Sequence, residues 1–213
     1  GAGCAGWGRG WDGGGGRVTV AGGWVVGTRA CDRGGLFTIY SPSGDAVTLN
    51  RVVVPSNPAT AAAGGLAATL DNSAGFDLVH SQVYGNTAYQ GGGVYLSGNP
   101  SFGLGAVLIE DSSISSNSAS LNAGLENDVF GAGHAVSVLN SSFHNNTAGF
   151  PGGAIANSGT ITVTGSTLNA NSAGTTTSAL GGGGGVYQAG PVSSATFTND
   201  TLSRTFNTAM RLV

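Results

Sequence analysis

The stretch of sequence that decides the fold is GGAIANSGTITVTGSTLNANSA, residues 152–173. It ends in an Asn-x-Ala triplet that recurs along the chain. The five triplets begin at Asn57, Asn86, Asn117, Asn146 and Asn171, in steps of 29, 31, 29 and 25 residues. A self-similar period of this length marks a repeat architecture, in which each repeat buries its apolar face against its neighbours. The sequence therefore predicts stacked coils.

Each triplet is preceded by apolar residues at fixed distances. The residues three, eight and ten places before the asparagine are apolar in all five repeats, and the residue five places before is small or apolar. Alternation with period two is typical of a strand with one buried face. The phase slips by one residue between the eighth and fifth places, which predicts a bend at the sixth place. A third strand is expected after each small-residue pair: Gly64-Gly65, Gly92-Gly93, Ala123-Gly124, Gly152-Gly153 and Gly184-Gly185.

No segment shows a helical period with start and stop signals. We therefore predict an all-β, right-handed parallel β-helix, or solenoid, over residues 17–213, with about five to seven coils and three short strands per coil. Residues 1–16 are rich in glycine and tryptophan and are expected to form an N-terminal cap or arm. Cys4 and Cys31 lie outside the regular repeats, and we expect them to form one disulfide, a bond that persists in oxidising compartments.

The composition points away from intracellular chemistry. Glycine makes up 40 of 213 residues, lysine is absent, only 8% of residues are charged and the net charge is −3. An average globular domain carries about 25% charged residues. The chain offers no basic patch for nucleic acid, and its apolar runs are far shorter than the roughly 20 residues of a membrane span. We expect an extracellular or cell-surface location and no membrane insertion. Because the chain does not begin with Met, we expect a mature product or a fragment.

The repeat in residues 152–173 resembles the Gly-Gly-Ala-Ile…Asn-Ser-Ala repeat of bacterial β-helix surface proteins. These include polymorphic outer-membrane proteins, autotransporter passengers and large secreted proteins of pectin-lyase-like fold. The resemblance covers residues 45–205 and implies an extracellular structural or adhesive module rather than an enzyme. Expected partners are further copies of the chain or adjacent domains of a longer one, and glycans; no cofactor is expected. The alternative is a polysaccharide lyase or hydrolase, or a calcium-dependent glycan-binding module, on the same fold.

The five in-phase asparagines are the leading constellation. Stacked at one corner, their amides would hydrogen-bond from coil to coil, as amide ladders do in cross-β stacks. A structural ladder is the favoured interpretation, and a polar binding stripe is the alternative. Serines five places earlier, at 81, 112, 141 and 166, would form a second stack.

Catalytic residues are not expected, although the bend column places Arg51, His80 and Asp111 on successive coils. A cation, an imidazole and a carboxylate in one row could hold an acidic substrate or transfer protons. Polar, solvated side chains are also common at bends, and this is the interpretation we adopt.

No metal is expected either. If one were bound, Glu126 and Asp128, with Glu110 and Asp111, would supply the oxygen ligands that calcium prefers. Acidic loop residues are more simply explained as solvated side chains.

Three Asn-x-Ser/Thr sequons begin at Asn140, Asn145 and Asn199 and are candidate glycosylation sites in a eukaryotic secreted protein. The run Thr160-Ile161-Thr162-Val163-Thr164 would suit a regular threonine array of the kind that binds ice. We expect no neighbouring coil to repeat it.

Overall fold

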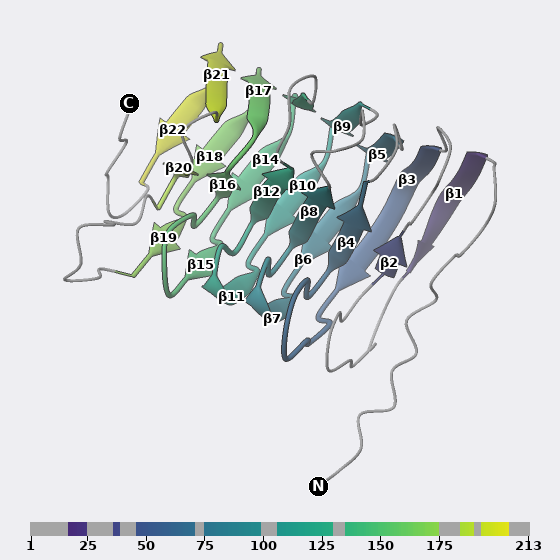
Figure 1. Cartoon of the computed structure of the whole chain (residues 1–213), viewed down its shortest axis with the longest axis horizontal. Coiled ribbons are helices and arrows are strands. Elements are labelled where there is room, and N and C mark those ends of the chain that lie inside the picture. Colours follow the sequence, from purple (N-terminus) through teal and green to yellow (C-terminus); the bar gives the residue numbers. More distant parts are fainter. Residues whose placement is uncertain are drawn as a thin grey trace, which may run out of the picture.

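The computed structural model shows an all-β parallel solenoid of about four turns with three parallel sheets (Figure 1). It describes residues 17–24, 36–38, 46–70, 75–98, 106–129, 135–174, 184–189 and 193–204. The predicted fold class is confirmed at this level, whereas the predicted count of five to seven coils is not. The N-terminal segment 1–16, Cys4 and Cys31 lie outside the described residues, so the cap and the disulfide stay predictions.

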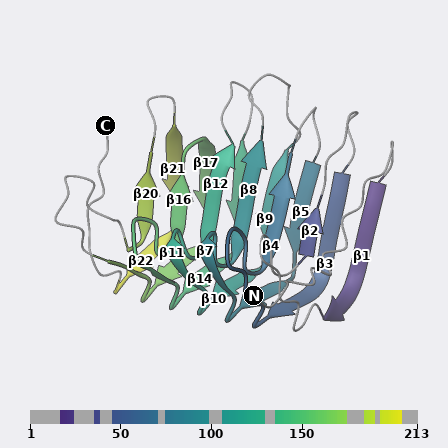
Figure 2. The same cartoon turned by 60° about the horizontal axis from the view of Figure 1, so that its bottom comes forward.

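The first sheet has 12 strands, in the order β21-β17-β13-β9-β5-β3-β6-β10-β14-β18-β22, with β1 pairing β3. Its strands are β1 (Arg17–Trp24), β3 (Ala46–Pro55), β5 (Gly75–Val79), β6 (Gln82–Tyr84), β9 (Val107–Glu110), β10 (Ser113–Ser115), β13 (Val136–Leu139), β14 (Ser142–His144), β17 (Thr160–Thr164), β18 (Thr167–Asn169), β21 (Ser194–Thr198) and β22 (Thr201–Ser203). The long strand β3 runs through the first bend and pairs with both β5 and β6. The two strand sets that the repeat predicts therefore belong to one bent sheet, which Figure 2 shows with the bottom of the molecule turned forward.

Two smaller sheets complete each coil. The second sheet has the order β19-β15-β11-β7 and the third the order β2-β4-β8-β12-β16-β20. The second contains β7 (Thr87–Gln90), β11 (Ser118–Leu121), β15 (Thr147–Ala148) and β19 (Ser172–Ala173). The third contains β2 (Leu36–Thr38), β4 (Leu66–Thr69), β8 (Val94–Gly98), β12 (Leu125–Val129), β16 (Ile155–Asn157) and β20 (Val186–Gln188).

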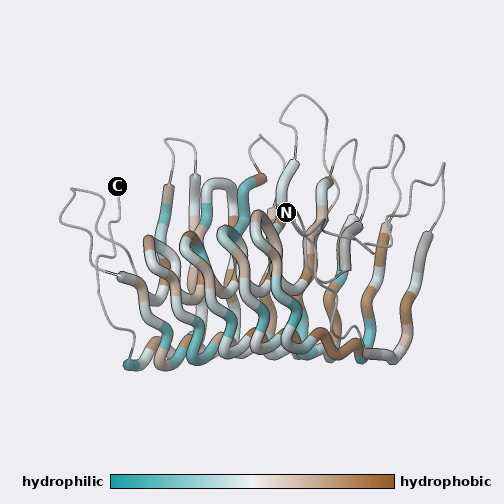
Figure 3. Tube along the Cα trace, turned by 90° about the horizontal axis from the view of Figure 1, so that it is seen from below, coloured by the Kyte–Doolittle hydropathy of each residue, from teal (hydrophilic) through white to brown (hydrophobic). Residues whose placement is uncertain are grey.

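The strands pair in the register that the repeat predicts. The residue three places before the asparagine forms one buried column, in which Val83 pairs with Ile114 and Phe143 pairs with Leu168. Leu202 continues this column into the last described coil. Ala195 and Phe197 continue the columns ten and eight places before the asparagine. The core is built from the inward columns of the first and third sheets, and Figure 3 shows the alternating hydropathy along successive coils. No helix in the described ranges is long and apolar enough to cross a membrane.

Each coil turns at residues with left-handed backbone. The first bend falls at the predicted sixth place, where φ is positive at Arg51, His80, Asp111, Asn140, Gly165 and Asn199. The second bend immediately precedes the asparagine column, at Ser56, Gly85, Ser116, Asn145, Ala170 and Arg204. The third corner precedes the third sheet and uses Ala63, Gly91, Asn122 and Gly152. Few L-residues tolerate this region, so the repetition of these conformations fixes where each coil turns.

The paired glycines before the third sheet are required by close stacking. A Cβ on Gly64 would lie 2.6 Å from the carbonyl oxygen of Gly92 and 2.7 Å from that of Thr87. The predicted alignment of Ala123-Gly124 with Gly152-Gly153 is wrong by one residue. Leu125 pairs with Ile155, and the main-chain N–H of Gly124 donates to the carbonyl of Gly153. Ala154, rather than the second glycine of its pair, therefore occupies the place of Gly124. The extra residue lies before this corner, since Gly152 stands six places after Asn146, whereas Asn122 stands five places after Asn117.

Candidate functional site

The asparagine column forms a continuous buried ladder at the second bend. All five asparagines are at most 1% exposed. The side-chain Nδ2 of each donates to Oδ1 of the next, at 3.0 Å for the first three steps and 2.9 Å for the last. The same Oδ1 atoms also accept the main-chain N–H of the preceding asparagine, at 2.9–3.1 Å. This chemistry holds coils together and leaves no amide free for a ligand within the stack.

Asn117 shows how fully the ladder uses each amide. Its Oδ1 accepts two hydrogen bonds from Asn86, one from the main chain and one from Nδ2. Its Nδ2 donates to Val83 O and to Asn146 Oδ1, each at 3.0 Å. An Asn side chain has two donor hydrogens and one acceptor oxygen with two lone pairs, so its capacity is met.

The serine column forms a second ladder at the first bend. Oγ of each serine accepts a hydrogen bond from the main-chain N–H at the same place in the preceding coil. Ser112 Oγ, for example, accepts from Ser81 N at 3.0 Å. The hydroxyl then donates to a carbonyl of its own coil, in Ser112 to Glu110 O at 2.8 Å. Asp200 takes the serine place in the last described coil, where its carboxylate accepts Ser166 N and Thr198 N at 2.6 and 2.9 Å.

A third ladder was not anticipated from the sequence. Asn127 Nδ2 donates to Asn157 Oδ1 at 2.6 Å, and Asn157 Nδ2 donates to Gln188 Oε1 at 3.0 Å. The signal was present, because each amide residue stands two places after the apolar residue that begins its strand. Aligning the coils by their small-residue pairs obscures this column, because the coil of Asn146 carries one extra residue before Gly152.

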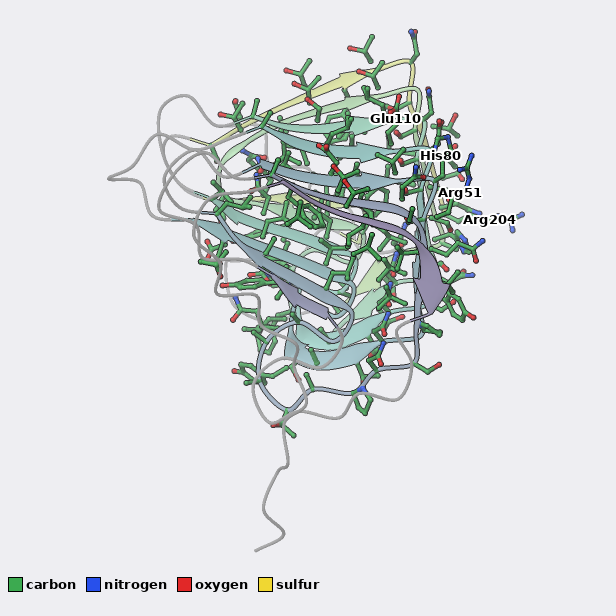
Figure 4. The ribbon with its side chains drawn as sticks, turned by 90° about the vertical axis from the view of Figure 1, so that its right-hand side faces the viewer. Arg51, His80, Glu110 and Arg204 are labelled. Atoms are coloured by element: carbon green, nitrogen blue, oxygen red, sulfur yellow. The ribbon has the colours of Figure 1, made fainter. Side chains whose placement is uncertain are left out.

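The charged residues of the first bend form an exposed edge rather than a cleft. Arg51 and His80 of this bend, and Glu110 next to it, point outward in the view along the solenoid, as does Arg204 of the second bend (Figure 4). His80 Nε2 lies 3.3 Å from Asp111 Oδ2, and their side chains are 48% and 42% exposed. An exposed ion pair of this kind contributes little to stability. Among the described residues, Arg51 makes no ion pair.

The sequence-predicted acidic residues fall into two separate places. Glu110 and Asp111 lie at the first bend, whereas Glu126 and Asp128 lie on β12 in the third sheet, so the four carboxylates do not meet. Among the residues described, no cluster of three or more His, Cys, Asp or Glu side chains could hold a metal ion.

Glu126 is the one strongly perturbed titratable group of the described chain. It is 6% exposed although it points to the outer side of the third sheet. Burial raises its pKa to about 7, while hydrogen bonds from Gln90 and Asn122 lower it and the nearby Asp128 raises it. Burial also raises the pKa of Asp128, against a hydrogen bond with Tyr95. A carboxyl group that titrates near neutral pH is suited to proton transfer.

The three sequons begin at exposed left-handed bends. Asn140 and Asn199 occupy the first bend and Asn145 the second, with φ of 47°, 56° and 58°. All three side chains are exposed and therefore accessible to modification.

The outer face of β13, β14, β17, β18, β21 and β22 is rich in hydroxyl groups, and we call it the hydroxyl face. Its members are Ser137, Ser142, Thr160, Thr162, Thr164, Thr167, Ser194, Thr196, Thr198 and Thr201. Thr162 pairs with Thr196 and Thr164 with Thr198, so the threonine run does recur in the next coil, contrary to the expectation from sequence. No outward position of these six strands is Asp, Glu, Lys or Arg. Apart from a 3.4 Å contact between Ser194 and Thr160, these hydroxyls have no side-chain partner among the described residues.

Comparisons with known protein families, with curated proteins and with solved structures find no match. The resemblance of the repeat to bacterial surface proteins therefore identifies no family, and the site must be interpreted from its own geometry.

Proposed function

We propose that this chain is an extracellular structural or adhesive surface module, with the hydroxyl face as its adhesive surface. The observation that carries the proposal is the in-register grid of hydroxyls, of which only Ser194 and Thr160 pair with each other, on a scaffold held rigid by three internal ladders among the described residues. We further propose that the solenoid is right-handed, like those of polymorphic outer-membrane proteins and autotransporter passengers.

The chemistry of the face favours a neutral glycan as the partner. A surface without carboxylates or guanidinium groups has no electrostatic attraction for charged polymers. A single exchange of a water contact for a hydroxyl contact contributes only about 0.5–1.5 kcal/mol. Useful adhesion therefore needs many contacts made together from a rigid surface, because a preorganised array loses little conformational entropy on binding.

A single substitution on the hydroxyl face tests this proposal. Thr162→Lys would place a long charged side chain across the grid, and Thr87→Lys is the matched control on the outer face of the second sheet. We expect wild type and Thr87→Lys to bind neutral glycans on an array, with and without a calcium chelator, and Thr162→Lys to lose that binding. Equal binding by the two variants, or binding to anionic glycans alone, would contradict the assignment of this face.

Self-association along the solenoid axis is part of the proposal. Among the described strands, β1 pairs only with β3, and β21 and β22 pair only with β17 and β18. Edge strands of this kind offer unpaired N–H and C=O groups to another chain. Light scattering should show a mass that rises with protein concentration. A monomer at every concentration would contradict self-association but not the adhesive function.

A second candidate function is favoured by Glu126 alone. A carboxyl group with a pKa of about 7, two residues from Asp128, is the kind of acid that glycoside hydrolases use in pairs. Incubation with neutral and uronic-acid polysaccharides tests it, because release of reducing ends by the wild type and not by Glu126→Gln would establish an enzyme. We expect no release.

A further inference from the structure

The third corner holds two buried acceptor oxygens that lack a donor. Oε2 of Glu126 and Oδ1 of Asn122 have almost no accessible surface and no hydrogen-bond partner. The other carboxylate oxygen, Oε1, accepts a hydrogen bond from Gln90 Nε2 at 2.6 Å. Gln90 ends β7 in the preceding coil, and Asn122 forms the corner directly before β12. The carboxyl group of Glu126 therefore contacts two successive coils at one corner.

The next coil covers this corner. A Cβ on Gly152 would lie 2.9 Å from Asn122 Oδ1, so the glycine lets the following corner pack against the amide. Water is thereby kept from an oxygen that would otherwise be solvated. A buried acceptor without a donor destabilises the fold, and a carboxylate with such an oxygen, Oε2, is more stable in its protonated form.

We propose that Glu126 is a neutral carboxylic acid in the folded chain, with its proton on Oε2, and that loss of this proton loosens the third corner. One proton removes the negative charge from the buried group and needs no additional space. A calcium ion would require six to eight oxygen ligands, more than this corner presents. On deprotonation the proton passes to water and leaves a buried carboxylate.

The described groups around Glu126 offer no cation to compensate that charge. Asp128 lies two residues along the same strand, Tyr95 is the partner of Glu126 on β8, and Ala156 is its partner on β16. Gln90 and Asn122 are uncharged amides. The one charged neighbour is therefore Asp128, which disfavours ionisation of Glu126.

The direction of the pH effect follows from the two protonation states. The folded chain binds the proton with a pKa of about 7, against 4.5 for an ordinary glutamate. A carboxyl group whose pKa is raised by folding stabilises the fold at low pH, and that contribution is lost as pH rises from about 4.5 through about 7. The difference of about 2.5 units corresponds to a roughly 300-fold change in the unfolding equilibrium constant.

The experiment compares urea unfolding of wild type and Glu126→Gln from pH 5 to pH 9. Glutamine keeps the shape, accepts from Gln90 and is uncharged at every pH, so the two proteins should match near pH 5. By pH 9 the wild type should unfold up to roughly 300-fold more readily than the variant. Parallel curves across this range would overturn the proposal.

Two further readouts keep the test independent of stability. Infrared difference spectra of wild type minus Glu126→Gln should show a protonated carboxyl band at pH 6 that disappears at pH 9. Hydrogen exchange, corrected for intrinsic rate, should accelerate at high pH at the amides of Gly91 and Gly92, which donate to Leu121 O and Asn122 O. Absence of the carboxyl band at pH 6 would overturn the proposal.

The variant Asn122→Gly tests whether the titrating group lies at this corner, and glycine suits the positive φ of 51° there. Because the hydrogen bond from Asn122 lowers the pKa of Glu126, its removal should raise the titration midpoint. A midpoint that does not move would place the titrating carboxyl group elsewhere and overturn the proposal.

Discussion

Replacement of Asn117 by aspartate is the sharpest perturbation of the asparagine ladder. The two side chains have the same shape, so the substitution leaves packing volume unchanged. Aspartate keeps oxygens that can accept from Asn86 but loses both donors, and the donors face Val83 O and Asn146 Oδ1. A carboxylate at this position, which is 1% exposed, would meet two acceptors and no cation.

The expected cost follows from these contacts. An uncompensated buried charge destabilises a protein by about 3–5 kcal/mol. Whole domains are stable by about 5–15 kcal/mol, so the substitution should remove a large share of the stability. With a urea m-value of about 2–3 kcal/mol/M, the unfolding midpoint should fall by roughly 1–2 M.

The matched control is Asn145→Asp, at an exposed bend with φ of 58° that aspartate also tolerates. Urea unfolding followed by circular dichroism at pH 7 should leave this control near wild type. Lowering the pH should partly restore Asn117→Asp, because a protonated carboxyl group regains one donor. If the two variants unfold within about 0.5 kcal/mol of each other at pH 7, the donors of Asn117 do not stabilise the fold.

Three other outcomes are expected. Gly64→Ala would place a Cβ within 2.7 Å of two main-chain oxygens and should lower Tm, whereas at Gly75 the nearest atom lies at 3.4 Å and alanine should be tolerated. Ser112→Ala removes the acceptor of a buried main-chain N–H and should cost about 1–3 kcal/mol, with faster hydrogen exchange at that amide. Intact mass without reductant should show Cys4 and Cys31 bridged, lighter by two hydrogens than the reduced chain; two alkylatable thiols would count against the bond.

The strand register could be predicted because the repeat is carried by inward side chains. Apolar residues at fixed distances from each asparagine must share a face, and a slip of one residue would expose the whole set. The left-handed bend at Arg51, His80 and Asp111 follows from the same phase change. These features depend on residues within one coil, which a linear sequence displays.

The candidate site could not be predicted because it depends on contacts between coils. The burial of Glu126 requires Gln90 from the coil before and the corner of Gly152 from the coil after. Sequence alone makes Glu126 an acidic residue beside a turn, which is normally solvated. The hydroxyl face was missed for a related reason. Thr162 pairs with Thr196 in the next coil, and that coil lacks the asparagine that marks the other repeats.

The asparagine ladder also gives the solenoid a direction. Every step points the same way, with Nδ2 of one coil donating to Oδ1 of the coil that follows it in sequence. The side-chain amide dipoles are therefore aligned along the axis, and aligned hydrogen bonds of this kind polarise and strengthen one another. A coil stacked in reverse would set oxygen against oxygen or amino group against amino group. Each formed coil is thus a polar template that accepts its neighbour in one orientation only, so the stack as a whole has a polarity.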